Sequence, residues 1–329
     1  MMSNNSSLEI KLQVGVKSSE TAYNIVAGIM IFITTFGAIS NGVVIYAFLK
    51  IFKGCPSTFN GLIISVTVSD ILMIVISGTI NIASGFNRGF VFGEAGCSFL
   101  AFWVHFFSVS SVAHLTALSI ERYRIISERS VHHNFSRTRT AVVILICYLY
   151  SFAWVIPPIV GWSSYTTEGM EISCSVNWKA GDWNSMSYNI TILFTVFIIP
   201  FGIILICYRK LFRLLKNARD VDVGSPDLAK RRSVEKSVAS LVVIMVVAFL
   251  ISWSPYVIMS IWAMLPFTEE VSPLAATLPA LIAKSSTIYN PIIYGMKHRA
   301  FRQQISGAWR KRFRNRMGVQ EPSPEEVEQ

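Results

Sequence analysis

Residues 238–263 read VASLVVIMVVAFLISWSPYVIMSIWA and contain no charged side chain. About 20 mostly apolar residues in a helix cross the hydrocarbon core of a bilayer, so this run predicts a membrane-spanning helix. A helix is favoured because it pairs its backbone polar groups within one segment, as lipid requires. Six further apolar runs lie at residues 24–49, 58–82, 97–120, 140–160, 187–208 and 273–295. The sequence therefore predicts an all-α membrane protein, a bundle of seven transmembrane helices.

The composition of the whole chain agrees with this interpretation. Of the 329 residues, 52% are hydrophobic and 15% are charged, whereas soluble domains average about 25% charged residues. Such a chain has too little polar surface for a cytosolic globule, and it is too apolar for a disordered protein. The net charge is +10, but the basic residues lie between the apolar runs rather than in one patch, so the charge does not indicate nucleic-acid binding.

The placement of lysine and arginine predicts how the bundle is oriented. Of 29 such residues, 24 fall on one predicted side and four on the other, and Lys284 lies inside a span. Because cytoplasmic loops carry the excess of positive charge, we expect a plasma-membrane protein with its N-terminus outside and its C-terminus in the cytoplasm. Asn4 and Asn5 then begin glycosylation sequons on the outer side. Asn134 also begins one, but on the cytoplasmic side.

Four segments follow from these patterns: an extracellular segment (1–23), the bundle (24–298), a surface helix (299–314) and a disordered tail (315–329). The surface helix is predicted from apolar residues at four-residue intervals, with basic residues between them. This pattern is typical of a helix lying on the inner leaflet of the bilayer. The alternative is a disordered basic tail. The apolar residues are Phe301, Ile305, Trp309 and Phe313.

The five cysteines divide by compartment. Cys97 begins the third span and Cys174 lies in the outer loop before the fifth. Both are on the oxidising side, so we expect a disulfide between them, with two free thiols as the alternative. Cys55, Cys147 and Cys207 lie in spans or near the cytoplasm, where free thiols are expected.

Lys284 is the most informative residue, because it lies in the middle of the seventh run. A lysine at the bilayer centre costs about 2.5–3.5 kcal/mol on insertion scales, and it is too far from either end to reach water by snorkelling. Three interpretations are open: a partner in an ion pair, a residue on an ion path, or an amine that forms a Schiff base. A desolvated lysine amine is a usable nucleophile for an aldehyde.

Several motifs together resemble those of rhodopsin-class G-protein-coupled receptors. They are Glu121-Arg122-Tyr123 ending the third span, Trp253-Ser254-Pro255-Tyr256 in the sixth, Asn290-Pro291-Ile292-Ile293-Tyr294 ending the seventh, and the pair Cys97 and Cys174. Lys284, seven residues before Pro291, matches the position at which opsins hold retinal. The resemblance covers about residues 24–313. The sequences around Lys284 and Cys174 resemble most closely the non-visual neuropsin- and peropsin-like opsins.

The opsin resemblance implies a retinal cofactor, 11-cis or all-trans, and a counter-charge for its protonated Schiff base. Visual opsins of vertebrates carry a glutamate three residues after the third-span cysteine, but this chain has Leu100 there. Glu168 in the outer loop matches the other counterion position of the family, and Glu171 is the reserve. The use of Glu168 implies a bistable pigment whose photoproduct light converts back.

The resemblance also assigns a retinal pocket and an activation switch. The pocket residues are Lys284, Glu168, Trp253, Tyr256, Phe197 and Ala280. The switch comprises Asp70, Asn41 and Asn290 in a polar network, and near the cytoplasm Glu121, Arg122, Tyr123, Tyr208, Glu235, Pro291 and Tyr294. In the family, an acid at the position of Glu235 pairs with this arginine and keeps the receptor inactive.

The function expected from the resemblance is that of a light-sensing receptor that activates a heterotrimeric G protein, by subgroup resemblance an inhibitory one. Arrestin and a receptor kinase are further candidate partners, although the tail offers few phosphorylation sites, and no nucleic acid is expected. Two alternatives stay open: a retinal photoisomerase, which would be an enzyme, and a chemically gated receptor with an unreactive lysine. No metal site is expected, because His105 and His114 are not at ligand spacing. Tyr148 replaces the tryptophan usual in the fourth span, where we expect local packing changes.

Overall fold

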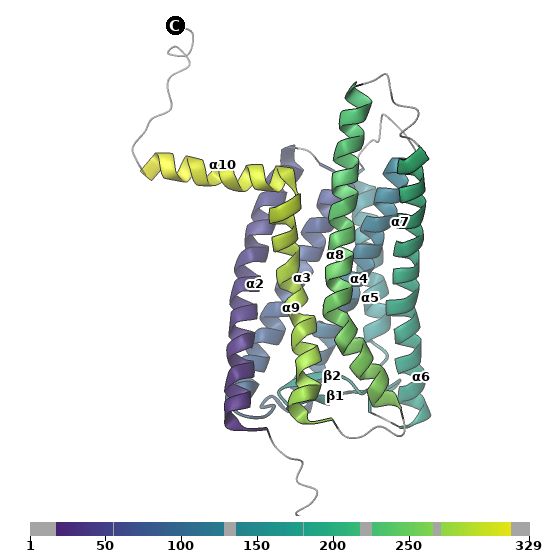
Figure 1. Cartoon of the computed structure of the whole chain (residues 1–329). Helices are drawn as coiled ribbons and strands as arrows, with labels where there is room; N and C mark the ends of the chain where they lie inside the picture. The colour runs from purple at the N-terminus through teal and green to yellow at the C-terminus, as the bar shows by residue number, and fades with distance from the viewer. Residues whose placement is uncertain are drawn as a thin grey trace, which may run out of the picture.

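The computed structural model describes residues 18–54, 56–127, 136–179, 181–217, 226–265 and 271–316. Within this part of the chain, seven helical rods run side by side (Figure 1). They are α2 (Glu20–Gly54), α3 (Thr58–Phe86), α4 (Gly93–Ser127), α5 (Arg137–Val155), a rod of α6 (Trp183–Ile192), η1 (Leu193–Ile198) and α7 (Ile199–Asn217), α8 (Pro226–Met264), and α9 (Pro273–Lys297). The predicted seven-helix architecture is confirmed. Asn4, Asn5 and the tail after Arg316 lie outside the described residues.

Six of the rods are long and apolar enough to cross a membrane. Their exposed side chains include many large apolar residues. In the most apolar stretch of α5, only 22% of the residues are buried inside the protein. Such a surface requires lipid around it. The corresponding window of α3 is 61% buried, so α3 is the most central of the six. The seventh rod, α9, is less apolar because it carries the polar sequence from Lys284 to Thr287, and it packs between α2 and α8.

Prolines explain where several helices end or bend. Helix α5 ends at Val155, five residues before the predicted limit, because Pro157 and Pro158 cannot continue the backbone hydrogen bonding of a helix. Pro255 lies within α8, and Figure 1 shows α8 bending in its lower part. In the α6–α7 rod, a six-residue π-helical turn precedes Pro200, a feature that often accompanies functional sites.

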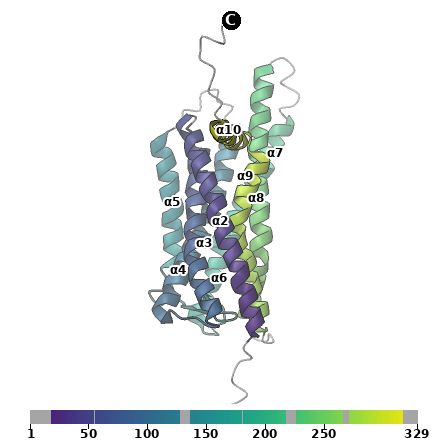
Figure 2. The same cartoon turned by 90° about the vertical axis from the view of Figure 1, so that its left-hand side faces the viewer.

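A short helix crosses one end of the bundle. Helix α10 (Arg299–Arg316) lies roughly perpendicular to the other helices, and Figure 2 shows it end-on. Phe301 is buried and stacks near Phe48, with ring centroids 5.9 Å apart. Ile305 packs against the same core, which anchors the first half of α10 to α2 and α9. The side chains of Trp309 and Phe313 lie outside the described residues.

Tyr148 does more than alter local packing. Its hydroxyl lies 3.0 Å from Ser65 Oγ and 3.1 Å from Ser69 Oγ on α3. Ser65 Oγ also lies 2.8 Å from Nε2 of the buried His114 on α4. Hydrogen bonds of Tyr148 therefore connect α5 to α3 and, through Ser65, to α4. The expectation of packing changes alone was incomplete, because the serines and the histidine that complete the network are distant in sequence.

Candidate functional site

The main cavity of the described structure has a volume of about 130 Å³. It lies between α4, the α6–α7 rod, α8 and α9, and a hairpin of β1 (Tyr165–Glu168) and β2 (Ser173–Val176) closes one end. Its walls are mainly apolar, with Glu168 and Lys284 as the charged groups among the described lining residues. All six predicted pocket residues contribute to the lining: Lys284, Glu168, Trp253, Tyr256, Phe197 and Ala280.

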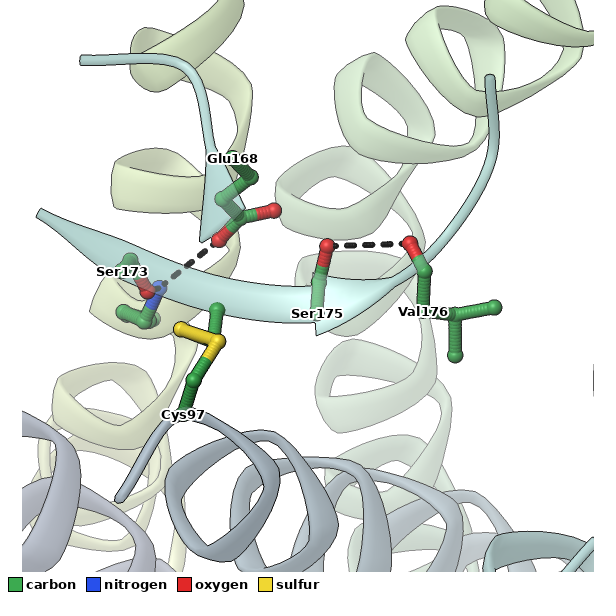
Figure 3. Close-up of a disulfide and its surroundings, with 7 residues drawn as sticks. Cys97, Glu168, Ser173, Ser175 and Val176 are labelled. Atoms are coloured by element: carbon green, nitrogen blue, oxygen red, sulfur yellow. Dashed lines mark hydrogen bonds and ion pairs between the residues drawn. A yellow bond between two sulfur atoms is a disulfide. The ribbon is translucent and has the colours of Figure 1, made fainter. Parts of the chain in front are cut away.

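The hairpin positions its polar residues by strand register. The strands are antiparallel and pair Thr167 with Cys174 and Glu168 with Ser173. Cys174 forms the expected disulfide with Cys97 at the start of α4, which fixes β2 to the bundle. Figure 3 shows Glu168 and Ser173 close together on adjoining ends of the two strands, beside the disulfide. Directly opposite residues of an antiparallel pair share one face, so both side chains can reach the same partner.

A glycine turn attaches the hairpin to α9. Gly169 has a positive φ of 58°, and a β-carbon there would lie 2.2 Å from Thr277 Oγ1, so only glycine allows this approach. The next backbone N–H, of Met170, donates to the same Oγ1 at 2.8 Å. Thr277 lies two helical turns before Lys284 on α9, on a similar face. The contact therefore aligns the hairpin with Lys284.

The amine of Lys284 lies against this hairpin. Lys284 is 6% exposed, and its Nζ donates to Ser173 Oγ at 3.1 Å and lies 3.6 Å from Glu168 Oε1. A buried cation is costly unless it is paired, and Glu168 supplies the opposite charge. Of the three interpretations that the sequence left open, this geometry supports an ion pair and remains compatible with a Schiff-base amine. Glu171 is exposed, has a positive φ of 58° and does not line the cavity.

Polar contacts continue from Glu168 into α8. The Tyr256 hydroxyl donates to Glu168 Oε2 at 3.4 Å and accepts from the indole N–H of Trp178 at 3.1 Å. Sequence reasoning did not assign roles to Ser173 and Trp178. The only indication of these residues in the sequence was that they lie close to Cys174. The contact of Ser173 with Lys284 could not be foreseen, because the two residues are 111 positions apart.

Another pair outside the sequence prediction is His105 and Tyr165. His105 lines the cavity, and its Nδ1 lies 3.3 Å from the Tyr165 hydroxyl. This hydroxyl donates to the backbone carbonyl of Val155 at 2.8 Å. Burial raises the pKa of Tyr165 above its usual value of 10, so the phenol stays protonated and fixes β1 to the end of α5.

Trp253 connects the main cavity to a smaller polar one. Its indole N–H donates to Ser286 Oγ at 3.3 Å, and its ring lines both cavities. The smaller cavity, about 10 Å³, also contains Asp70, whose carboxylate accepts from Asn290 Nδ2 at 2.9 Å and from Ser111 Oγ at 3.4 Å. Movement of Trp253 would therefore disturb the surroundings of Asp70.

The predicted polar network is only partly brought together. Asn41 donates to the backbone carbonyls of Gly37 and Thr287, each at 2.9 Å, which connects α2 to α9. The described hydrogen bonds of Asn41 do not reach Asp70, so the network has two parts. Pro291 is buried within α9, one residue after Asn290.

The charged residues at the α10 end are arranged around Glu121. Its carboxylate pairs with Arg124 at 3.2 Å and with Arg139 of α5 at 3.1 Å. Arg122 is 5% exposed and lies over the ring of Phe59, 4.6 Å from its centroid. The predicted partner of Arg122, Glu235, has a side chain outside the described residues.

Three tyrosines belong to the same end of the bundle. The Tyr208 hydroxyl donates to the backbone carbonyl of Ala239 on α8 at 3.5 Å, while Tyr123 faces α7 with Lys210 over its ring. The Tyr294 side chain is fully buried, and its hydroxyl has no hydrogen-bond partner in the described part of the chain. Tyr208 is thus bonded to α8, and Tyr294 belongs to the same core cluster as Leu241 and Met245 of α8.

The site has the chemistry to hold a long apolar aldehyde. A primary amine projects into a cavity with aromatic and aliphatic walls, and a carboxylate beside it balances a positively charged linkage. Lys284 is therefore the residue at which an aldehyde would fit for covalent attachment. Trp253, Tyr256 and Phe197 supply apolar walls for a polyene.

Comparisons with known proteins agree with the geometry. Residues 40–294 match the family described as 7 transmembrane receptor (rhodopsin family). The chain is 32% identical over 291 residues to a melanopsin-like protein of Danio rerio (87% of this chain, 58% of that protein). It is 30% identical over 281 residues to opsin-VA of Rutilus rutilus (85% and 72%). The crystal structure of squid rhodopsin superposes with a TM-score of 0.83 at 29% identity, covering 95% of this chain and 91% of that chain. The chain thus spans little more than half the length of the melanopsin-like relative.

Proposed function

Because the chain belongs to the rhodopsin family of seven-transmembrane receptors, and within it to the opsins, we propose that it is a light-sensing receptor that holds retinal on Lys284. The observation that carries the proposal is the placement of the Lys284 amine 3.6 Å from Glu168 in a cavity with mainly apolar walls. Closeness to neuropsin- and peropsin-like opsins stays a prediction.

Retinal, when bound, supplies a polyene that absorbs light and changes shape. The protein residues do the rest. Lys284 fixes the aldehyde end, Glu168 balances the positive charge, and Ser173 offers an oxygen to the N–H of the linkage. Tyr256 donates to the other carboxylate oxygen of Glu168 and holds it in place. Because Glu168 belongs to the hairpin rather than to a moving helix, we propose that the charge pair survives a change of retinal shape and that the pigment is bistable.

Signal transfer would begin at Trp253. Trp253 lies on α8 and lines both the main cavity and the Asp70 cavity, so displacement of its ring would act on α8 directly and on the surroundings of Asp70. The two receptor states differ in the position of α8, and light shifts their populations by changing which state the ligand favours. We propose that the outer end is the hairpin side and that a heterotrimeric G protein, of the inhibitory type, binds at the α10 end.

The test is absorbance after reconstitution with 11-cis and with all-trans retinal, in separate samples. We expect a band at longer wavelength than free retinal in the wild type, none in Lys284→Ala, and an unchanged band in Lys179→Ala, which removes an exposed lysine. A second illumination should restore the dark spectrum of a bistable pigment. If folded wild-type protein gives no band with either isomer, the proposal is wrong and a chemically gated receptor is favoured.

The isomers released after illumination decide between a receptor and a photoisomerase. A receptor should retain its retinal and activate purified G protein in light. Binding of all-trans retinal in darkness, with release of the 11-cis isomer in light and no G-protein activation, would establish the enzyme instead.

A further inference from the structure

A second, smaller cavity adjoins Lys284. It has a volume of about 10 Å³ and is bounded by α2, α3, the hairpin and α9. Lys284, Glu168 and Ala280 line both this cavity and the main one, so these residues separate the two. Lys284 therefore borders both the main cavity and the small cavity.

Asn81 is the unexplained polar group of the small cavity. It is 3% exposed and lines the cavity from α3. Its side-chain Oδ1 is buried and has no hydrogen-bond partner among the described residues. An unsatisfied buried acceptor costs about 1–3 kcal/mol, so a partner inside the cavity would stabilise the fold.

The cavity fits one water molecule and nothing much larger. About 10–15 Å³ and two to four polar partners are what a buried water requires. The cavity has this volume, and its lining includes Asn81, Ser173 and Lys284, whose side chains carry the polar groups that such a water needs. An ammonium has three N–H donors, of which the contacts with Ser173 and Glu168 account for two. An ion is disfavoured because Lys284 and Glu168 already balance each other.

We propose that Asn81 holds a water molecule beside Lys284 and that this water is the reactant that releases retinal from the protein. The inference rests on the proposed retinal linkage. In the reaction, the C=N double bond of the protonated linkage breaks and the water oxygen forms the C=O bond of free retinal. Both water hydrogens go to nitrogen, which remains as the ammonium of Lys284. Asn81 is thus a positioning residue, which sets how long the protein keeps its chromophore.

The first experiment measures loss of the visible band in darkness. Asn81→Leu, which fills the cavity with apolar atoms, should slow this loss about tenfold. This factor is expected if the loss of one hydrogen bond to the water raises the activation barrier of hydrolysis by roughly the free energy of that bond. Asn81→Ser, which keeps a hydroxyl and leaves room for water, should retain the wild-type rate. Ser84→Ala is the matched control: Ser84 is another buried, unpartnered side chain of α3 but does not line the cavity. Equal rates in wild type and Asn81→Leu, with both bands present, would overturn the inference and leave the proposed function intact.

The second experiment needs no retinal. Infrared spectra of the apoprotein in ordinary water and in water labelled with oxygen-18 should reveal an isotope-sensitive O–H stretch in the wild type and in Asn81→Ser. Asn81→Leu should lack this band, while its thermal unfolding temperature stays at or above that of the wild type. A wild-type apoprotein without the band would overturn the water site. Absence of a visible band after reconstitution would instead overturn the retinal proposal.

Discussion

Substitution of Glu168 by glutamine tests the charge pair in the apoprotein. The variant keeps the shape of the side chain but leaves the Lys284 ammonium buried without a negative partner. Because both side chains are largely buried, 8% and 15% exposed, water can replace little of what is lost. We expect the variant to lose much of its stability, and we expect this loss to disappear when Lys284 is replaced as well.

The expected magnitude follows from the distance. Two unit charges 3.6 Å apart interact by about 4–5 kcal/mol at an effective dielectric constant of about 20. Breaking one side of a buried pair typically costs about 3–5 kcal/mol, so we expect the single variant to lose about 3–4 kcal/mol. Lys284→Met removes the cation. The double variant Glu168→Gln/Lys284→Met should therefore recover most of the loss, with a coupling free energy of about 2–4 kcal/mol.

The assay is thermal unfolding of detergent-solubilised apoprotein, followed by a thiol-reactive dye. Cys147 and Cys207 are free and buried, so they react with the dye as the bundle opens. Glu171→Gln is the matched control, because it removes the same charge from an exposed position on the same hairpin, and it should change stability little. A coupling below about 0.5 kcal/mol, or equal losses in the two glutamine variants, would refute the reasoning.

Three further predictions concern the α10 half of the bundle. Burial, and to a smaller extent Arg122, lowers the pKa of His298 from 6.5 to about 4, and its neutral Nδ1 accepts the first-turn N–H of Phe301 in α10 at 3.1 Å. The unfolded chain therefore binds a proton at this histidine more readily than the folded protein does. The free energy of unfolding that neutral His298 contributes above pH 6.5 should fall as the pH is lowered from 6.5 to 4. Thermal melts of His298→Asn, which keeps a hydrogen-bond acceptor, should not show this dependence on pH. Arg139→Ala removes the ion pair between α5 and Glu121 and should raise G-protein activation in darkness about two- to fivefold. The effect is small because a partly exposed ion pair contributes about 1 kcal/mol or less. Arg137→Ala, which removes an exposed arginine of the same helix, should leave dark activation unchanged. Tyr148→Phe should lower the free energy of unfolding in the dye assay by about 1 kcal/mol, because a typical hydrogen bond contributes about that much. An unchanged value would show that the contacts of Tyr148 with the two serines do not stabilise the fold.

Apolar length predicted most of the architecture, because lipid imposes a simple requirement on every span. The exceptions had local causes. Helix α5 ends early, at Val155, because two prolines follow it. Helix α8 begins at Pro226, well before its apolar run, because polar residues outside the bilayer can also form a helix. The weak apolarity of α9 arises from Lys284 and its polar neighbours, which face the interior rather than lipid.

The site was predictable in part. The position of Lys284 within a span required a buried partner, and the family pattern directed attention to Glu168. Sequence alone could not show that Ser173 contacts this amine or that Asn81 and Lys284 line one small cavity, because the first depends on the hairpin register and the second on how α3 and α9 lie in the bundle. Nor could it show that Glu121 pairs with Arg139, because the two residues belong to different helices, α4 and α5.

The hairpin also has a consequence for protein engineering. Its twelve residues from Tyr165 to Val176 carry both groups that touch the Lys284 amine, and the disulfide at Cys174 and the Thr277 contact hold them at two independent points. The polar groups beside the Lys284 amine therefore form a compact cassette within one uninterrupted stretch of the amino-acid sequence. If the proposed function holds, exchanging this cassette between related bundles, with a threonine retained at the docking position on α9, should alter the absorption of the pigment without any change in the helices.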